Sequence, residues 1–361
     1  MPSGRGRSGA FLACFRDGAL QPGHPAIHLR FEETPGRRPM PATIPSWSSR
    51  LTPFLFWTAL CLLGPGALPV FSQESPDDDY RLVVDVDLVT VLASVTTAEG
   101  ALAAGLGRHD FHLYEGGTAQ EIALFARESD RSLRLQLLFD SSLSITTELG
   151  SQQEAAIDFL RVVAKPGDRV SILQVSEDVV ELVRETSRPR AMARALRSIR
   201  PQGGTSLYDA VYLASQALSL SRGRRVILII SDGTDTTSKV SMEECLRQVL
   251  ASEAVVYVLL VQPIKSEAGR NLAGERSMIY LTRETGGRTF MVASPDALRD
   301  SFARIGEELR TQYLLGYYPR HDREPEKFRR IRIEVDLAGA RVRARSGYHA
   351  AAGPRLPARA R

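Results

Sequence analysis

Cysteine is scarce in this 361-residue chain, which contains only Cys14, Cys61 and Cys245. The three form no CxxC pair and stand in no His-rich spacing, so the sequence offers no zinc site of a familiar kind. Cys245 lies in MEECLRQVL, which has a helical pattern. We interpret it as a buried structural thiol.

An apolar run long enough to cross a membrane is also missing. The longest candidate, Leu51–Leu63 (LTPFLFWTALCLL), is too short for a spanning helix. It follows the basic Arg50 and precedes GPGALPVFSQ, in which Val70 and Ser72 fit the −3 and −1 positions of a signal-peptidase site. The pattern predicts a secretory signal. An uncleaved N-terminal anchor is the alternative.

The signal sets the expected start and location of the protein. We predict that Met40 is the true start, that residues 1–39 are disordered and lie upstream of it, and that 40–72 are removed. The mature chain would then hold Cys245 alone and no transmembrane span. The protein is expected to be exported and to be periplasmic, associated with the cell envelope or secreted.

A net positive charge is absent from the part expected to fold. The whole chain carries a formal charge of +4. Residues 1–39 contribute +3 and residues 351–361 another +3, which leaves −2 for everything between them. The folded part is therefore close to neutral, and we expect no nucleic-acid partner.

Strands and helices alternate from residue 133 onward. Apolar, strand-like runs occupy 133–140, 169–176, 178–185, 225–231, 254–261 and 288–293, and helical patterns occupy 149–164, 206–220 and 294–313. The runs 169–176 and 178–185 follow each other almost directly in the sequence and should form a hairpin. The others predict an α/β fold with a Rossmann-like, doubly wound, mainly parallel sheet.

The segments on either side of this region have β patterns of a different kind. Residues 80–96 are strand-like, and 110–125 resemble a hairpin that turns at Gly116-Gly117. Residues 331–337 alternate apolar and charged side chains, and 341–348 repeat the alternation. We predict one small antiparallel β domain built from both flanks, the alternative being extra edges on the main sheet. The arginines at 341–345 are interpreted as a solvated strand face.

Three loops with many oxygen atoms fall after or between the predicted strands. They are Asp140–Ser144, Gly203–Thr205 and Ser231–Asp235. In doubly wound sheets ligands bind at the carboxyl ends of the strands, where these loops should meet. Residues at i, i+2 and i+4 of an extended loop can turn to one side, so Asp140, Ser142 and Ser144 can converge. Mg²⁺ prefers such oxygen ligands.

The motifs DxSxS, GGT and SDGTD in this order resemble the metal-ion-dependent adhesion site of von Willebrand factor type A (vWA) domains and integrin inserted domains. The resemblance implies hydroxyl ligands from Ser142, Ser144 and Thr205, with Asp140 and Asp232 binding directly or through water. It also implies a divalent metal cofactor, Mg²⁺ first, with Mn²⁺ or Ca²⁺ as alternatives. Asp209 and Asp235 lie near the motif and are interpreted as turn, cap or supporting residues.

The arrangement is also similar to that of bacterial exported proteins with such a domain, over residues 80–350. The segments that carry this likeness are DFHLYEGGTAQEI near the start and YLLGYYP…FRRIRIEV…VRARSGY near the end. The expected domains are 1–39 disordered, 40–72 signal peptide, 73–130 N-terminal β segment, 131–312 vWA domain, 313–350 C-terminal β segment packed with 73–130, and 351–361 disordered tail.

Two main function classes follow. In the first, the protein is a binding or adhesion module, not an enzyme, whose metal is completed by an Asp or Glu carboxylate of a protein partner. In the second, it is a metal-dependent hydrolase or phosphotransferase with Asp140 as nucleophile. Ser142 stands where aspartate phosphotransferases have a second acid, and the chain lacks GxxxxGK[ST], HExxH and GxSxG motifs. We expect no catalytic residues; an envelope assembly or structural role is a third alternative.

Overall fold

The computed structural model describes the backbone of residues 29–31 and, in full, residues 88–127, 131–142, 149–261, 271–319 and 327–349. The predicted signal peptide, the C-terminal tail and Ser144 lie outside these described residues. None of the helices in this part of the chain is long and apolar enough to cross a membrane.

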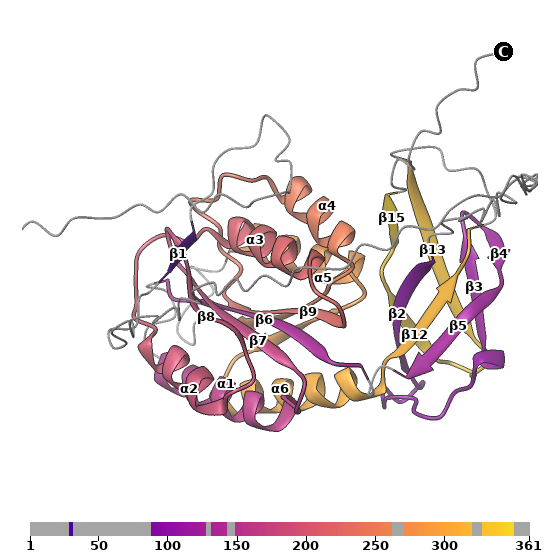
Figure 1. The fold of residues 1–361 in the computed structure, drawn as a ribbon, viewed down its shortest axis with the longest axis horizontal. Coiled ribbons are helices and arrows are strands. Elements are labelled where there is room, and N and C mark those ends of the chain that lie inside the picture. Colours follow the sequence, from indigo (N-terminus) through magenta and orange to yellow (C-terminus); the bar gives the residue numbers. More distant parts are fainter. Residues whose placement is uncertain are drawn as a thin grey trace, which may run out of the picture. The chain divides into compact units, whose positions relative to one another are not determined.

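A seven-stranded sheet forms the centre of the α/β region (Figure 1). Its order is β1 (Leu29–Phe31), β8 (Val179–Thr186), β7 (Arg169–Val175), β6 (Leu133–Asp140), β9 (Arg224–Ser231), β10 (Val255–Val261) and β11 (Arg288–Val292). All neighbours are parallel except β7 and β8, which form the predicted antiparallel hairpin. The predicted mainly parallel sheet is confirmed.

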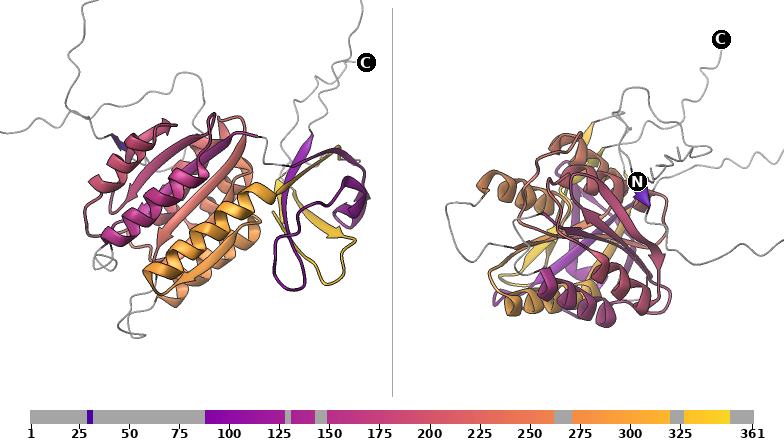
Figure 2. Two further views of the ribbon diagram at one scale, coloured as in Figure 1. Left: turned by 90° about the horizontal axis from the view of Figure 1, so that it is seen from below. Right: turned by 90° about the vertical axis from the view of Figure 1, so that its left-hand side faces the viewer.

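Helices cover both faces of this sheet (Figure 2). One face packs against α1 (Leu149–Val163), α2 (Pro189–Ser198) and α6 (Pro295–Thr311), and the other against α3 (Leu207–Ser219), α4 (Met242–Ser252) and α5 (Leu272–Glu284). Every residue of β10 is buried, because a strand covered on both faces has no solvated side. Cys245 on α4 is fully buried, as expected.

Two four-stranded antiparallel sheets form a separate sandwich. One has the order β14 (Arg341–Ala344), β2 (Val89–Thr96), β12 (Tyr313–Tyr317), β5 (Ile122–Arg127), and the other β15 (Gly347–His349), β13 (Phe328–Val335), β3 (Phe111–Glu115), β4 (Thr118–Gln120). A short 3-10 turn, η1 (Arg108–Asp110), precedes β3. Both chain flanks supply strands to both sheets, so the antiparallel β assembly predicted from the two flanks is present.

Aromatic side chains fill the space between the two sheets. The rings of Phe111 and Tyr313 lie 5.0 Å apart, and those of Phe125 and Tyr313 5.8 Å apart. The β3–β4 hairpin turns at Gly116 and Gly117, whose φ angles are +56° and +88°. A two-residue turn with positive φ at both positions is the turn that glycine permits and that matches strand twist.

The last C-terminal segment with alternating side chains, predicted as one strand, is split between the two sheets of the sandwich. Residues 341–344 pair with β2, whereas 347–349 pair with β13 in the other sheet. The expected solvated arginine face is wrong for two of its members. Arg343 contacts the buried carboxylate of Glu308 at 2.5 Å, and Arg345, only 7% exposed, lies 3.1 Å from Glu253. Both side chains form ion pairs with acidic residues of the α/β region.

The strand β1 falls in residues 1–39, for which the sequence shows no periodicity. Its backbone pairs in parallel with β8, Leu29 opposite Val179. The remainder of this N-terminal region lies outside the described residues.

Candidate metal centre

Asp140 is the last residue of β6 and the centre of the candidate site. Its side chain is fully buried. Oδ1 accepts a hydrogen bond from the backbone N–H of Ser142 at 2.8 Å, and Oδ2 accepts one from the hydroxyl of Ser231 at 2.6 Å. Ser231 ends β9, the strand next to β6, so parallel pairing brings these two ends together. Both oxygens of the carboxylate are thus fixed by hydrogen bonds.

Burial raises the pKa of Asp140 to about 6. The hydrogen bonds from Ser231 and Ser142 oppose this shift, while the negative charge of Asp232 adds to it. Asp140 belongs to the first loop and Asp232 to the third. A cation beside Asp140 would favour its charged form.

Hydrogen bonds to β7 and to the segment before the second loop fix the first loop in place. Ser141 donates its backbone N–H and its hydroxyl to the carbonyl of Val175, at 2.9 and 3.0 Å. Its own carbonyl accepts from the backbone of Gln202 at 2.8 Å, just before the second loop. Ser142 is 8% exposed, and its hydroxyl also hydrogen-bonds with Asp140. The described part of the first loop therefore points its polar groups inward.

The second loop makes a close approach that requires glycine. Gly204 has φ +72°, and a Cβ there would lie 3.0 Å from the Cβ of Glu177. Thr205 follows, 2% exposed, and its carbonyl accepts from the backbone of Thr236 and Thr237 at 2.8 and 3.1 Å. These bonds fasten the second loop to the chain just after the third.

The third loop is shaped by its own side chains. Asp232 Oδ1 accepts from the backbone of Thr234 at 2.8 Å, and Ser231 Oγ accepts from Gly233 at 2.9 Å. Asp235 Oδ1 accepts from the backbone of Leu207 and Tyr208 at 2.8 and 3.2 Å. These two N–H groups begin α3, so Asp235 caps that helix.

Asp209 has a similar supporting role. It is 3% exposed, and its Oδ1 accepts from the backbone of Lys239 and Val240 at 2.9 and 3.0 Å. The interpretation of Asp209 and Asp235 as cap and supporting residues agrees with these bonds.

Two contributors have no assigned role in the sequence prediction. The sequence indicates Ser231 only as the start of its loop, yet its hydroxyl contacts Asp140 directly. Gly274 near the start of α5 lies against the third loop, because a Cβ there would be 2.1 Å from the carbonyl oxygen of Gly233. The position of Ser231 at the end of a buried strand was the available signal for the first. Nothing in the local sequence marks the second.

The donor atoms at this edge suit a hard divalent cation. Of the candidate ligands expected from the sequence, Asp140, Asp232, Ser142 and Thr205 are described, and their side chains offer only carboxylate and hydroxyl oxygens. Within the described residues no three His, Cys, Asp or Glu side chains gather into a metal-binding group. A cation here would therefore be held by a mixed set of carboxylates and hydroxyls. The three loops, read from the sequence, contain no histidine, cysteine or lysine that could act as a base.

The doubly wound sheet and the loops at its carboxyl edge place this region in a known class. Residues 135–234 match the family model of the von Willebrand factor type A domain. The chain therefore contains a von Willebrand factor type A domain, and all described loops of the candidate site fall within or directly beside the matched residues. No curated protein matches the sequence.

Several solved bacterial structures are similar in fold. The conserved hypothetical protein BatB from Bacteroides thetaiotaomicron is 18% identical, with 49% of this chain and 98% of that chain covered and a TM-score of 0.40. The vWF domain of the type V pili tip protein Mfa5 from Porphyromonas gingivalis is 11% identical, with 49% and 94% covered and a TM-score of 0.40. The pilus adhesin SpaC from Lactobacillus rhamnosus GG is 9% identical, with 70% and 49% covered and a TM-score of 0.41.

Proposed function

We propose that this protein is an exported binding or adhesion-type protein that engages a protein partner through a divalent cation. The cation, Mg²⁺ first and Mn²⁺ or Ca²⁺ as alternatives, would be held by Asp140, Ser142, Ser144, Thr205 and Asp232. The observation that carries the proposal is the buried Asp140 carboxylate, which is hydrogen-bonded from two loops and lies within range of the charge of Asp232.

The charge balance of the site favours binding of a further carboxylate. Only two of the five candidate ligands are charged, and the others are neutral hydroxyls. Bound there, a divalent cation would supply an electrophilic position for an Asp or Glu side chain of a partner. The residues of this chain would orient the cation: Ser231 and Ser142 fix Asp140, and Thr236 holds the second loop in place.

The enzyme alternative has less support from the same residues. A hydrolase or phosphotransferase with Asp140 as nucleophile needs the carboxylate to reach a substrate. Both oxygens of Asp140 already accept hydrogen bonds, and the side chain is fully buried. Ser142 also stands where aspartate phosphotransferases have a second acid, so the residue that would assist such an attack is missing from that position. An envelope assembly or structural role remains the other candidate, since it would use the same site with a different partner.

An affinity capture experiment tests the proposed function. Purified chain starting at Gln73 would be incubated with surface and envelope proteins extracted from the organism that produces it, either with Mg²⁺ or with chelator. We expect a partner retained only with Mg²⁺ and lost with Asp140→Ala. The matched control is Asp158→Ala, which removes an exposed carboxylate of α1 that pairs with Arg161. A partner retained equally in chelator would contradict the metal-dependent mode.

A further inference from the structure

The end of the third loop and the residues directly after it are bonded to the second loop. Residues 235–238 lie beside Thr205–Asp209, which lead into α3. Each of these five residues at the start of α3 has a backbone N–H that donates a hydrogen bond. Four of the N–H groups donate to side chains of residues 235–238, and that of Ser206 donates to the carbonyl of Ser176. The second and third loops therefore form one hydrogen-bonded unit.

Thr236 holds the backbone of Thr205 on both sides of its Cα atom. The hydroxyl oxygen of Thr236 accepts from the N–H of Thr205 at 2.9 Å, and the N–H of Thr236 donates to the carbonyl of Thr205 at 2.8 Å. Thr237 donates its N–H to the same carbonyl at 3.1 Å. The peptide planes before and after Thr205 are both fixed by these bonds, and with them the direction of its Cα–Cβ bond.

The side chain of Thr205 has little freedom of its own. The residue is 2% exposed, and a side chain that branches at Cβ has a stiff χ1 angle. Every hydrogen bond that Thr205 forms with a described residue involves its backbone, so its hydroxyl is left for a cation. A candidate metal ligand is thus presented in one direction that is set before any cation binds.

The candidate cations differ in how far they tolerate a displaced ligand. Mg²⁺ requires near-octahedral coordination at about 2.0–2.1 Å, whereas Ca²⁺ accepts oxygens at about 2.3–2.6 Å in variable number and flexible geometry. A ligand oxygen with a fixed position therefore favours the smaller ion. When that position becomes variable, Mg²⁺ should lose more affinity than Ca²⁺.

We propose that Thr236 is a positioning residue that makes this site select Mg²⁺ over Ca²⁺, because its hydroxyl fixes Thr205. The inference rests on the proposed metal-dependent function and names the residue that chooses the ion. Thr236 acts through Thr205 and is not itself a ligand. The residue is exposed although its hydroxyl is bonded, so its substitution removes the bond without opening a cavity in the core.

Calorimetric titration of the purified protein with magnesium chloride and, separately, with calcium chloride tests the proposal. The variant is Thr236→Val, which keeps the shape of the side chain and removes the acceptor of the Thr205 N–H. Thr236→Ser restores the hydroxyl. The ratio of the dissociation constants for Ca²⁺ and Mg²⁺ is the main readout, because a loss of stability alone would not change it.

Thr186→Val is the matched control. The hydroxyl of Thr186 also accepts from a backbone N–H, that of Arg188, at 3.1 Å. Thr186 ends β8 opposite Val170 at the start of β7, at the edge of the sheet away from the three loops.

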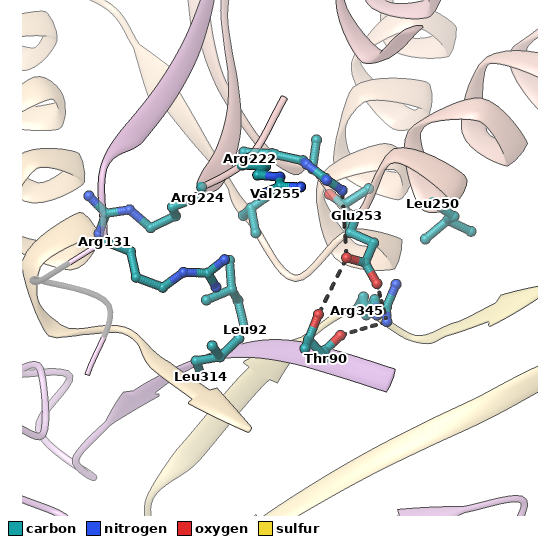
Figure 3. Close-up of a pocket in the computed structure, with 14 residues that line it drawn as sticks. Thr90, Leu92, Arg131, Arg222, Arg224, Leu250, Glu253, Val255, Leu314 and Arg345 are labelled. Carbon is teal, nitrogen blue, oxygen red and sulfur yellow. Dashed lines mark hydrogen bonds and ion pairs between the residues drawn. The ribbon is translucent and has the colours of Figure 1, made fainter. Parts of the chain in front are cut away.

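A second control, Thr90→Val, removes a hydroxyl that donates to Glu253 at 3.3 Å, beside the start of β9 (Figure 3). The eight residues of β9 separate this position from the metal centre by about 25 Å. Both controls therefore report the loss of a bonded threonine hydroxyl far from the site.

In Thr236→Val we expect the dissociation constant for Mg²⁺ to rise about tenfold and that for Ca²⁺ about threefold at most, as for the loss of one hydrogen bond. Thr236→Ser should restore both constants to within about twofold of wild type. Thr186→Val and Thr90→Val should leave both constants unchanged.

The possible contrary results separate this inference from the proposed function. Wild type that binds Mg²⁺, with the same ratio of constants in Thr236→Val, would overturn the role of Thr236 and leave the metal-dependent function standing. Wild type that binds Ca²⁺ as tightly as Mg²⁺ would overturn the selectivity alone. Wild type that binds neither ion would overturn both the inference and the proposed function.

Discussion

Ser231 donates a 2.6 Å hydrogen bond to Oδ2 of Asp140, although 91 residues separate the two in the sequence. The pair joins the ends of two neighbouring parallel strands, β9 and β6. It also fixes the carboxylate on which the proposed metal site depends. The first prediction concerns this carboxylate with and without a cation.

Asp140→Asn should stabilise the metal-free protein and abolish its response to Mg²⁺. The folded-state pKa of Asp140 is about 6, above the ordinary 3.8, so the metal-free fold favours the protonated form. That stabilisation is complete below pH 3.8 and is lost as the pH rises through about 6. At pH 7.5 in chelator, Asn should therefore raise the free energy of unfolding by about 1–3 kcal/mol. Urea denaturation measures it.

With Mg²⁺ the order should reverse. A ligand that binds only the native state stabilises it by about 2.7 kcal/mol at a hundredfold excess over its dissociation constant. Wild type should show this gain and Asp140→Asn should not. Ser142→Ala should lose less, since it deletes a neutral ligand only. Asp158→Asn serves as the control. Equal stability of wild type in Mg²⁺ and chelator would show that the site binds no cation.

Gly274→Ala should displace the third loop, against which α5 packs. The added Cβ would lie 2.1 Å from the carbonyl oxygen of Gly233, so the loop that carries Asp232 must move. We expect a loss of about 1–3 kcal/mol in unfolding free energy, in line with overpacking, together with weaker Mg²⁺ binding. Calorimetric titration with Mg²⁺ measures the second effect.

The control for this variant is Gly306→Ala on α6. A Cβ at Gly306 meets no heavy atom within 4 Å. Alanine there should stabilise the helix by about 0.5–1 kcal/mol and leave Mg²⁺ binding unchanged. Unaltered Mg²⁺ affinity in Gly274→Ala would show that the packing of α5 does not support the site.

Glu115→Gln should weaken the sandwich at neutral pH but not in acid. Glu115, 3% exposed, accepts hydrogen bonds from Tyr317 at 2.6 Å, Tyr348 at 3.0 Å and Arg329 at 2.8 Å. Burial alone would raise its pKa, but these three donors together lower it below 4.5. Its stabilisation is therefore present above pH 4.5 and is lost as the pH falls through the lowered folded value.

The variant removes the negative charge that Glu115 presents to Arg329, whose side chain is 10% exposed, and we expect a loss of about 3 kcal/mol at pH 7. The difference from wild type should shrink below pH 4. Near-UV circular dichroism of the tyrosines follows the transition. Glu243→Gln, at an exposed pair with Arg247, is the control. A pH-independent difference would mean that Glu115 acts through packing and not through charge.

The mature protein should begin close to Gln73. The basic Arg50, the apolar run 51–63 and the small residue Ser72 motivate this prediction. N-terminal sequencing of the native protein measures it. Residues 1–39 found attached to that protein would show that Met40 is not the start and that no signal is removed.

The central sheet could be predicted because its strands are continuous apolar runs. For β6 the predicted bounds, 133–140, are those in the structure, and α1 differs from its prediction by one residue at its end. The pairing of residues 341–349 could not be predicted in this way. Alternation shows that a strand has two unlike faces, but it does not tell which of two sheets the strand joins.

The ion pairs of Arg343 and Arg345 could not be predicted for a related reason. Their partners, Glu308 and Glu253, are distant in the sequence and belong to the α/β region. In the candidate metal centre the ligand types follow from the motif, whereas the contact of Gly274 with Gly233 depends on how α5 packs.

The pairing of Tyr313 with Arg127 places the entry and exit of the α/β region on adjacent strands of one sheet. The ribosome releases β2, β3, β4 and β5 long before β12 and β13. Until the later strands are made, the edges of the earlier sandwich strands that pair with them stay unpaired. The vWA domain can complete its own sheet during that delay, since its contacts are nearer in sequence. Synthesis order therefore makes the sandwich the last part to close, and the segment released last, from β14 onward, carries Arg343 and Arg345, which join the sandwich to the vWA domain.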